Sequence, residues 1–213
     1  MPKGYWLPQI DVGNPEGYKA YMAATPPAHE KYAGVALVRG GKCEVVEGRS
    51  RARVVLREFP DYAAALACYR SPEYQSARAL RLAHSQCDFV IAEGYDGLQP
   101  VKSGAAGADT AGAGPKGYWI AYVDVTQPDG FAAYQVALVP SIGKFGALFL
   151  VRSGAREVVE GAVRSRTVVV EFPSYDAARA CYRSNDYQAA KKLRDHKGEV
   201  DLVIVEGYGG PKF

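Results

Sequence analysis

The stretch Glu58-Phe59-Pro60-Asp61-Tyr62, followed by Cys68-Tyr69-Arg70-Ser71, decides the fold because it occurs twice. It returns 113 positions further along as Glu171-Phe172-Pro173-Ser174-Tyr175, followed by Cys181-Tyr182-Arg183-Ser184. About half of all positions paired by this offset are identical, and no gap is needed. Two other pairs of motifs share the offset: Gly4-Tyr5-Trp6 with Gly117-Tyr118-Trp119, and Glu93-Gly94-Tyr95 with Glu206-Gly207-Tyr208. The chain is therefore one domain written twice.

The repeat divides the 213 residues into three parts. We expect a first α+β repeat over 1–97, a flexible Gly/Ala-rich linker over 98–114, and a second repeat over 115–213. Each repeat is small, and a small domain buries a modest share of its surface. Two copies in one chain suggest that each needs the other for stability.

Within one repeat, the pattern predicts strand, helix, strand, strand, helix, strand. The first strand is apolar on both faces, which predicts that both faces are covered. This order indicates a ferredoxin-like βαββαβ repeat with both helices on one face of an antiparallel sheet. We expect the two repeats to pack sheet to sheet as an intrachain pseudo-dimeric α+β barrel. The first repeat is expected to have strands at 4–12, 35–39, 53–59 and 89–94, helices starting at Asn14-Pro15 and Asp61, breaks at Pro26-Pro27 and Ser71-Pro72, and a small extra hairpin near 43–48.

Composition argues against several classes of protein. The net charge is +3, and the basic residues Arg49, Arg51, Arg53 and Arg57 alternate on one strand, which favours a solvated face or ion pairing over nucleic-acid binding. Four cysteines and three scattered histidines provide neither a disulfide framework nor a spaced metal site. No apolar run is long enough to span a membrane and no secretory leader is evident, so we expect a cytoplasmic protein with no metal and no cofactor.

Several motifs together resemble the bacterial DUF1330 family of the dimeric α+β barrel superfamily. They include Gly4-Tyr5-Trp6, Val38-Arg39-Gly40-Gly41, Val45-Val46-Glu47-Gly48, Glu58-Phe59-Pro60 and Glu93-Gly94-Tyr95, and the resemblance covers both repeats and leaves out the linker. The family usually has one such domain, pairing as a homodimer, so the resemblance implies a fused pseudo-dimer here. It brings no settled activity. The wider superfamily includes cofactor-independent monooxygenases, lactone isomerases and haem enzymes, so fold alone does not give function.

Charged residues shared by both repeats lie on or beside the predicted strands. One interpretation is structural: Arg39 or Arg53 pairs with Glu47 or Glu58 and fixes the barrel. The alternative is that such an arginine grips a ligand carboxylate while a glutamate of raised pKa acts as a base. The candidate ligand-binding charges are Arg39, Glu47, Arg53 and their equivalents Arg152, Glu160 and Arg166, and the candidate bases are Glu58 and Glu171.

Aromatic residues give a second set of candidates. Tyr5, Trp6, Tyr69 and Tyr74 have the spacing of core residues, and the same side chains are suited to lining a pocket for a planar ligand. The equivalents Tyr118 and Tyr182 extend this set to the second repeat. His29 is a candidate base restricted to the first repeat, because its equivalent is Ile142.

Two functions follow from these candidates. One is a site in or beside the barrel for a small aromatic or carboxylated metabolite, with or without cofactor-independent chemistry. The other is a non-catalytic structural or interaction module whose repeats stabilise each other. The sequence leaves open whether the protein is an enzyme, and whether the pseudo-dimer assembles into a further homo-oligomer.

Overall fold

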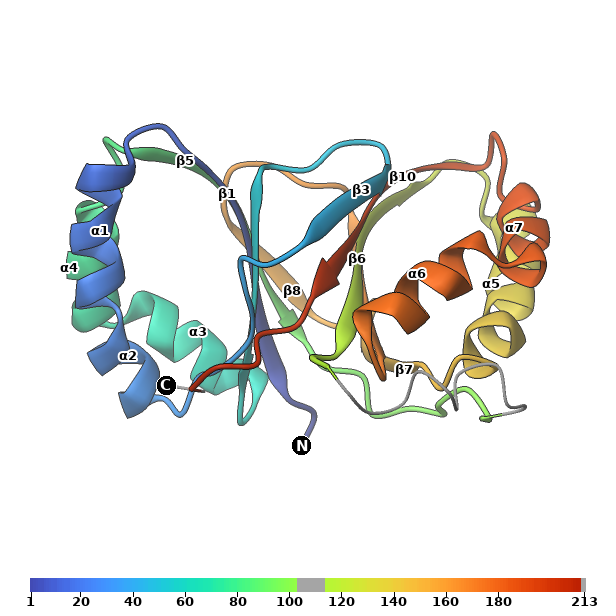
Figure 1. Cartoon of the computed structure of the whole chain (residues 1–213), viewed down its shortest axis with the longest axis horizontal. Helices are drawn as coiled ribbons and strands as arrows, with labels where there is room; N and C mark the ends of the chain where they lie inside the picture. Colours follow the sequence, from blue (N-terminus) through green and yellow to red (C-terminus); the bar gives the residue numbers. More distant parts are fainter. Residues whose placement is uncertain (103–113, 212–213) are drawn as a thin grey trace.

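The computed structural model describes residues 1–102 and 114–211 as two similar α+β halves, shown in Figure 1. The first half contains β1 (Gly4–Val12), α1 (Pro15–Ala24), α2 (Pro26–Lys31), β2 (Val35–Arg39), β3 (Cys43–Glu47), β4 (Arg53–Phe59), α3 (Tyr62–Arg70), α4 (Pro72–Ala79) and β5 (Ser85–Glu93). The second half contains β6 (Gly117–Val125), α5 (Pro128–Gly143), β7 (Leu148–Arg152), β8 (Arg156–Glu160), β9 (Arg166–Phe172), α6 (Tyr175–Arg183), α7 (Asn185–Lys192) and β10 (Gly198–Glu206).

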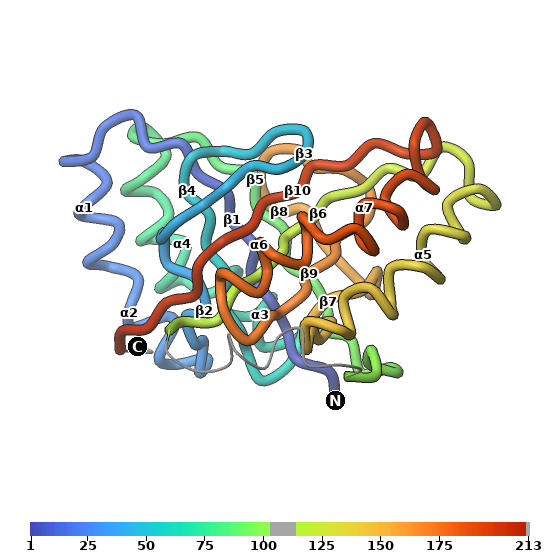
Figure 2. Tube along the Cα trace, turned by 45° about the vertical axis from the view of Figure 1, so that its right-hand side comes forward, coloured from blue at the N-terminus to red at the C-terminus, as the bar shows by residue number. Residues whose placement is uncertain are grey.

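Each half builds a five-stranded antiparallel sheet that contains one strand of the other half. The first sheet has the order β2-β4-β1-β5-β8, and the second has the order β3-β10-β6-β9-β7. The four strands that a half contributes to its own sheet have the expected ferredoxin-like order. The fifth strand is exchanged, because β3 pairs with β10 and β8 pairs with β5. Figure 2 shows β3 following β10 along the edge of the second sheet.

The two sheets face each other and share one apolar core, as the sequence predicted. Alternation along β1 directs Tyr5 and Leu7 into this core and Trp6 to the opposite face. Side chains of β6 come from the other sheet, and the Tyr122 hydroxyl donates to the Leu7 carbonyl at 3.3 Å. The helices cover the outer faces, so the order of layers is helix, sheet, sheet, helix (Figure 1).

Helix boundaries follow the predicted signals. The side chain of Asn14 caps α1 by accepting from the Gly17 amide, and Asp61 caps α3 by accepting from the Ala64 amide. Pro26 separates α1 from α2, whereas the second half has one unbroken helix, α5. Among the described residues, no helix combines the length and apolar character needed to cross a membrane.

Two sequence expectations were wrong in detail. The last strand of the first half begins at Ser85 and not near 89, because its polar first half pairs with β1 over the full length of that strand. The segment near 43–48 is no local hairpin in its own sheet, because β3 joins the sheet of the other repeat. The strands that pair with these two segments, β1 and β10, are far away in the sequence, so local periodicity does not reveal the pairing.

The predicted linker over 98–114 falls mainly on 103–113, which lie outside the described residues. The part that is described lies against the second half. The Gln99 side chain donates to the Phe149 carbonyl at 3.0 Å and accepts from the Phe149 amide at 2.8 Å, as a neighbouring strand would. This contact satisfies hydrogen-bonding groups on β7, the edge strand of the second sheet.

A sharp turn after β8 requires glycine. Gly161 has a φ of +65°, and a Cβ atom there would lie 2.1 Å from an Asp88 carboxylate oxygen. We expect Gly161→Ala to lower the free energy of unfolding by about 2 kcal/mol, because it adds backbone strain and displaces a carboxylate bound to Arg51. Gly114→Ala is the matched control, since nothing lies within 4 Å of its added Cβ. Denaturant titration of both variants measures the difference, and equal stability would refute the steric argument.

Candidate functional site

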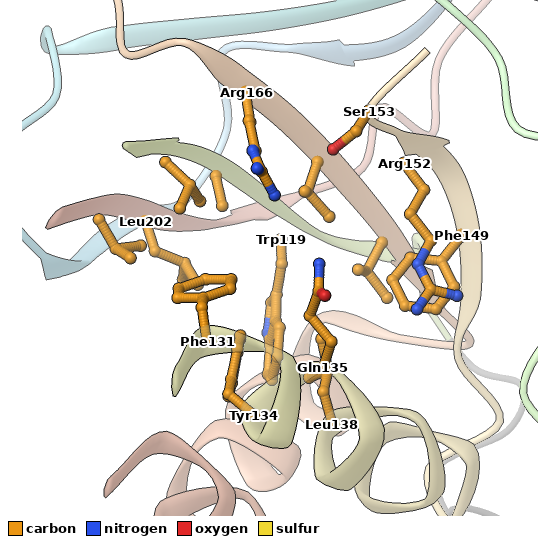
Figure 3. Close-up of a pocket in the computed structure, with 15 residues that line it drawn as sticks. Trp119, Phe131, Tyr134, Gln135, Leu138, Phe149, Arg152, Ser153, Arg166 and Leu202 are labelled. Carbon is orange, nitrogen blue, oxygen red and sulfur yellow. The ribbon is translucent and has the colours of Figure 1, made fainter. Parts of the chain in front are cut away.

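Each half contains a pocket between the outer face of its sheet and the helices that cover it. The first pocket is lined from β1, β2, β4, α1, α2 and α4, and encloses about 70 Å³. Trp6 and Tyr74 form an aromatic wall, with ring centroids 4.7 Å apart. The Tyr74 hydroxyl is hydrogen-bonded to the Tyr21 hydroxyl at 3.2 Å, which fixes both rings. Figure 3 shows the second pocket, at the equivalent position of the second half.

Strand alternation explains why three arginines reach the first pocket. On β4, Val54 and Leu56 point into the core between the sheets, so Arg53 and Arg57 point to the helix side. Arg39 joins them from the neighbouring strand β2. The side chains of all three arginines therefore line one cavity.

Two of the three arginines of the first pocket donate to backbone carbonyls, and the third lies over an aromatic ring. Arg57 is 8% exposed and donates to the Gly34 carbonyl at 2.6 Å, while Arg53 donates to the Arg39 carbonyl at 3.2 Å. Arg39 lies over the ring of Tyr208 from the other half, 5.7 Å from its centroid. Among the described residues, none of the three lies within 4 Å of a carboxylate oxygen. Glu30 is the acidic residue of the lining, and it is exposed at the rim.

Burial and mutual repulsion set the charge state of this pocket. The pKa of Arg57 is lowered to about 10, mainly by burial and to a smaller extent by the charge of Arg39. Burial also lowers the pKa of His29 to about 3, with smaller contributions from Arg57 and Arg39. At neutral pH the arginines are charged and the imidazole is neutral, so the pocket offers positive charge, one ring N–H donor and one ring acceptor.

The second pocket is more apolar. Its walls include Trp119, Phe131, Leu138 and Phe149, and it also encloses about 70 Å³. Arg152 lies on the Phe149 ring, 4.4 Å from its centroid. Its other polar side chains are Arg166, Gln135 and Ser153 (Figure 3).

A larger polar cavity of about 950 Å³ lies at one end of the barrel. Arg51 at this end is paired with Asp11 at 2.9 Å and with Asp88 at 2.6 Å. Arg164 makes the equivalent pairs in the second half, including Asp201 at 2.8 Å. Because these charges pair with one another, few charged groups at this end are left for a ligand. The helix-side pockets are the stronger candidates.

The structure places the predicted ligand residues in two groups. Arg39, Arg53, Arg152, Arg166 and His29 line the helix-side pockets. The others lie elsewhere. Tyr5 and Tyr118 are buried between the sheets, and Tyr69 and Tyr182 donate hydrogen bonds to backbone carbonyls of the opposite half. The four glutamates are all bound by other side chains: Glu58 by Tyr5 and Lys3, Glu171 by Lys116, and Glu47 and Glu160 by arginines.

The expected pairing of Arg39 or Arg53 with Glu47 or Glu58 was wrong. Glu47 is bound by Arg194 of the second half, through contacts of 2.6 and 2.7 Å. Glu160 makes the equivalent contact with Arg81 of the first half. Strand exchange is the reason, because it carries each glutamate to the opposite half.

Arg57 was missed as a site residue because the alternating arginines were interpreted as a solvated or ion-paired face. One signal was available in the sequence. The equivalent of Arg57 is the apolar Val170, and both residues are buried in the structure. Tyr21, Met22 and Gln135 were also missed as lining residues, since helix periodicity assigns them to the core.

A family model for DUF1330, a domain of unknown function, matches residues 3–95 and again 116–208. The chain belongs to the DUF1330 family. The two matches confirm that the DUF1330 domain is present twice, as the internal repeat predicted. No curated protein matches the chain.

Solved structures show what the paired DUF1330 repeats are similar to. A structure entitled "Putative monooxygenase (FN1347)" from Fusobacterium nucleatum has a TM-score of 0.54 at 12% identity, and the match covers 100% of this chain and 98% of that one. A "Putative Chlorite dismutase TA0507" has a TM-score of 0.50 at 7% identity, covering 98% and 96%. The RPA0582 protein of unknown function from Rhodopseudomonas palustris is 22% identical, with a TM-score of 0.35, over 46% of this chain and 85% of that one. The whole-chain matches confirm the α+β barrel fold of the DUF1330 pair, and at these identities they show the fold alone.

Proposed function

We propose that the first pocket binds a small organic metabolite that has a carboxylate and an aromatic or similarly flat apolar body. The observation that carries this proposal is the convergence of Arg39, Arg53 and Arg57 without a carboxylate partner among the described residues. A buried charge is normally paired, and Arg57 is buried while Arg39 and Arg53 are half-buried, so this cluster suits an anionic ligand. The wall formed by Trp6 and Tyr74 suits the flat body of that ligand.

A bound carboxylate would remove an unfavourable feature of the empty pocket. Arg57 and Arg39 repel each other, which contributes to the lowered pKa of Arg57. A carboxylate between them accepts charge-assisted hydrogen bonds and offsets this repulsion. The neutral His29 ring lines the same pocket, 5.6 Å from the Trp6 ring, and has one N–H group that a ligand oxygen can accept from.

The test uses the two tryptophans of the chain, one in each pocket. We expect para-ethylbenzoate to shift the indole NMR signal of Trp6 in the full-length protein, with para-ethylbenzamide as the uncharged probe of the same shape. The signals are assigned with Trp6→Phe and Trp119→Phe. Binding of the carboxylate should be at least about tenfold tighter than that of the amide, since charge-assisted bonds contribute about 1.5–3 kcal/mol each.

Replacing Arg57 by its counterpart in the other repeat gives a prediction for this site. We expect Arg57→Val to weaken binding of para-ethylbenzoate at Trp6 by about 10- to 100-fold, because one charge-assisted contact is lost. Arg70→Val is the control for net charge, as Arg70 is exposed and pairs with Glu157 outside the pocket. A purely structural role for this pocket would be favoured by either of two results. One is a Trp6 signal that does not shift when para-ethylbenzoate is added, and the other is an equal affinity for this probe in the wild type and in Arg57→Val.

A further inference from the structure

The surroundings of the second pocket differ from those of the first at equivalent positions. Two exchanges, Gln135 for Met22 and Ser153 for Gly40, add a polar group, whereas five others make the second pocket less polar or fill it. These five are Val170 for Arg57, Ile142 for His29, Leu138 for Thr25, Phe131 for Tyr18 and Phe149 for Ala36. One guanidinium, one imidazole and two hydroxyl groups are thereby replaced by hydrocarbon. The environment that suits a carboxylate is correspondingly reduced.

The two arginines that the second pocket retains, Arg152 and Arg166, occupy different parts of it. Arg152 is turned to one side of the pocket, where its guanidinium lies 4.4 Å from the centroid of the Phe149 ring (Figure 3) and 5.6 Å from that of the Tyr95 ring. Arg166 extends from β9 into the cavity above Trp119, and Gln135 extends from α5 toward the same space (Figure 3). Strand β9 and helix α5 thus present one partly buried guanidinium and one amide to a ligand.

Ser153 adds a polar group that the first pocket lacks. Its φ of +57° is unusual for a residue with a side chain, and the equivalent residue in the first repeat is Gly40, with a φ of +71°. Glycine adopts this conformation without strain, whereas serine does so at a cost. The serine hydroxyl points toward the cavity (Figure 3).

We propose that the second pocket binds an uncharged, largely hydrocarbon molecule with one carbonyl-type oxygen, and that the two pockets therefore take ligands of different chemical classes. A carboxylate entering this pocket would lose its hydration and meet a single cation in apolar surroundings. A neutral carbonyl oxygen loses less hydration, and can accept from Arg166, Gln135 or Ser153. Trp119 and Phe131 provide the apolar contact for its body.

The test follows the Trp119 indole signal of the full-length protein during titration with the same two probes. This signal is separate from that of Trp6, so failure of the carboxylate site does not affect the result. We expect para-ethylbenzamide to bind at Trp119 at least threefold more tightly than para-ethylbenzoate, the reverse of the order at Trp6. Gln135→Met, which introduces the residue of the first pocket, should weaken amide binding at Trp119 about fivefold and leave the Trp6 signal unchanged.

Two results would overturn the proposal. One is a preference for the carboxylate at Trp119 similar to that at Trp6, which would make the two pockets equivalent sites. The other is the absence of any response at Trp119 to either probe up to the solubility limit. The unchanged Trp6 signal in Gln135→Met serves as the check that this variant is folded.

Discussion

Glu47→Gln is expected to lower the free energy of unfolding by about 3 kcal/mol, since removing one partner of a buried ion pair leaves an uncompensated charge. The carboxylate of Glu47 is 11% exposed and is bound by Arg194, which is 6% exposed. Lys191 lies 3.8 Å from the same carboxylate, so the amide would leave two positive charges facing each other. Because Glu47 is on β3 and Arg194 follows α7, the loss weakens the contact between the repeats.

Glu44→Gln is the matched control on the same strand. Glu44 also pairs with arginines of the other repeat, Arg179 at 2.9 Å and Arg183 at 3.0 Å, but its side chain is 33% exposed. Exposed pairs contribute at most about 1 kcal/mol. Urea denaturation of the wild type and both variants measures the difference. Equal losses would show that burial of the Glu47 pair is not what holds β3 in place.

Acid sensitivity of folding is the second large effect, and it depends on His29. In the unfolded chain, a histidine takes up a proton below a pKa of about 6.5. In the folded protein, burial lowers the pKa of His29 to about 3, so it stays neutral over the interval between these values. The unfolded state then binds more protons than the folded state, and stability falls as the pH falls through that interval.

His29→Ile, which introduces the second-repeat residue, should remove this sensitivity. We expect the stability advantage of the variant to grow by about 1 kcal/mol per pH unit below about pH 6, reaching about 2 kcal/mol near pH 4. Denaturant titrations of both proteins between about pH 7 and about pH 4 measure it. A difference that does not change with pH would mean that the imidazole is protonated inside the fold.

The fold was predictable from the sequence because each helix and strand is encoded twice, so the pattern in one repeat could be checked against the pattern in the other. The Asn14 cap, the break at Pro26 and the alternation on β4 all act locally, so their residues carry the signal. The exchange of β3 and β8 was not predictable in the same way. It depends on which sheet edge accepts a strand, and that choice involves pairing over distances that local periodicity does not report.

The site was predictable in part for the same reason. Arg39, Arg53 and His29 were identified as residue types suited to binding, and they do line a pocket. Glu47 and Glu160 were grouped with these residues because their strands are next to those of the arginines in the sequence. Strand exchange, however, takes both glutamates to the opposite half of the structure. Arg57 was misjudged because burial is decided by what covers a strand, and the covering helix comes from elsewhere in the chain.

The exchanged strands also bear on how such a protein can evolve. In a homodimer of identical chains, every substitution appears in both halves at once, so the two pockets cannot drift apart. In this chain each repeat completes the sheet of the other, so a single copy would keep a full sheet only by exchanging a strand with a second chain. The covalent link removes that need for a second chain, and it lets selection act on each pocket separately.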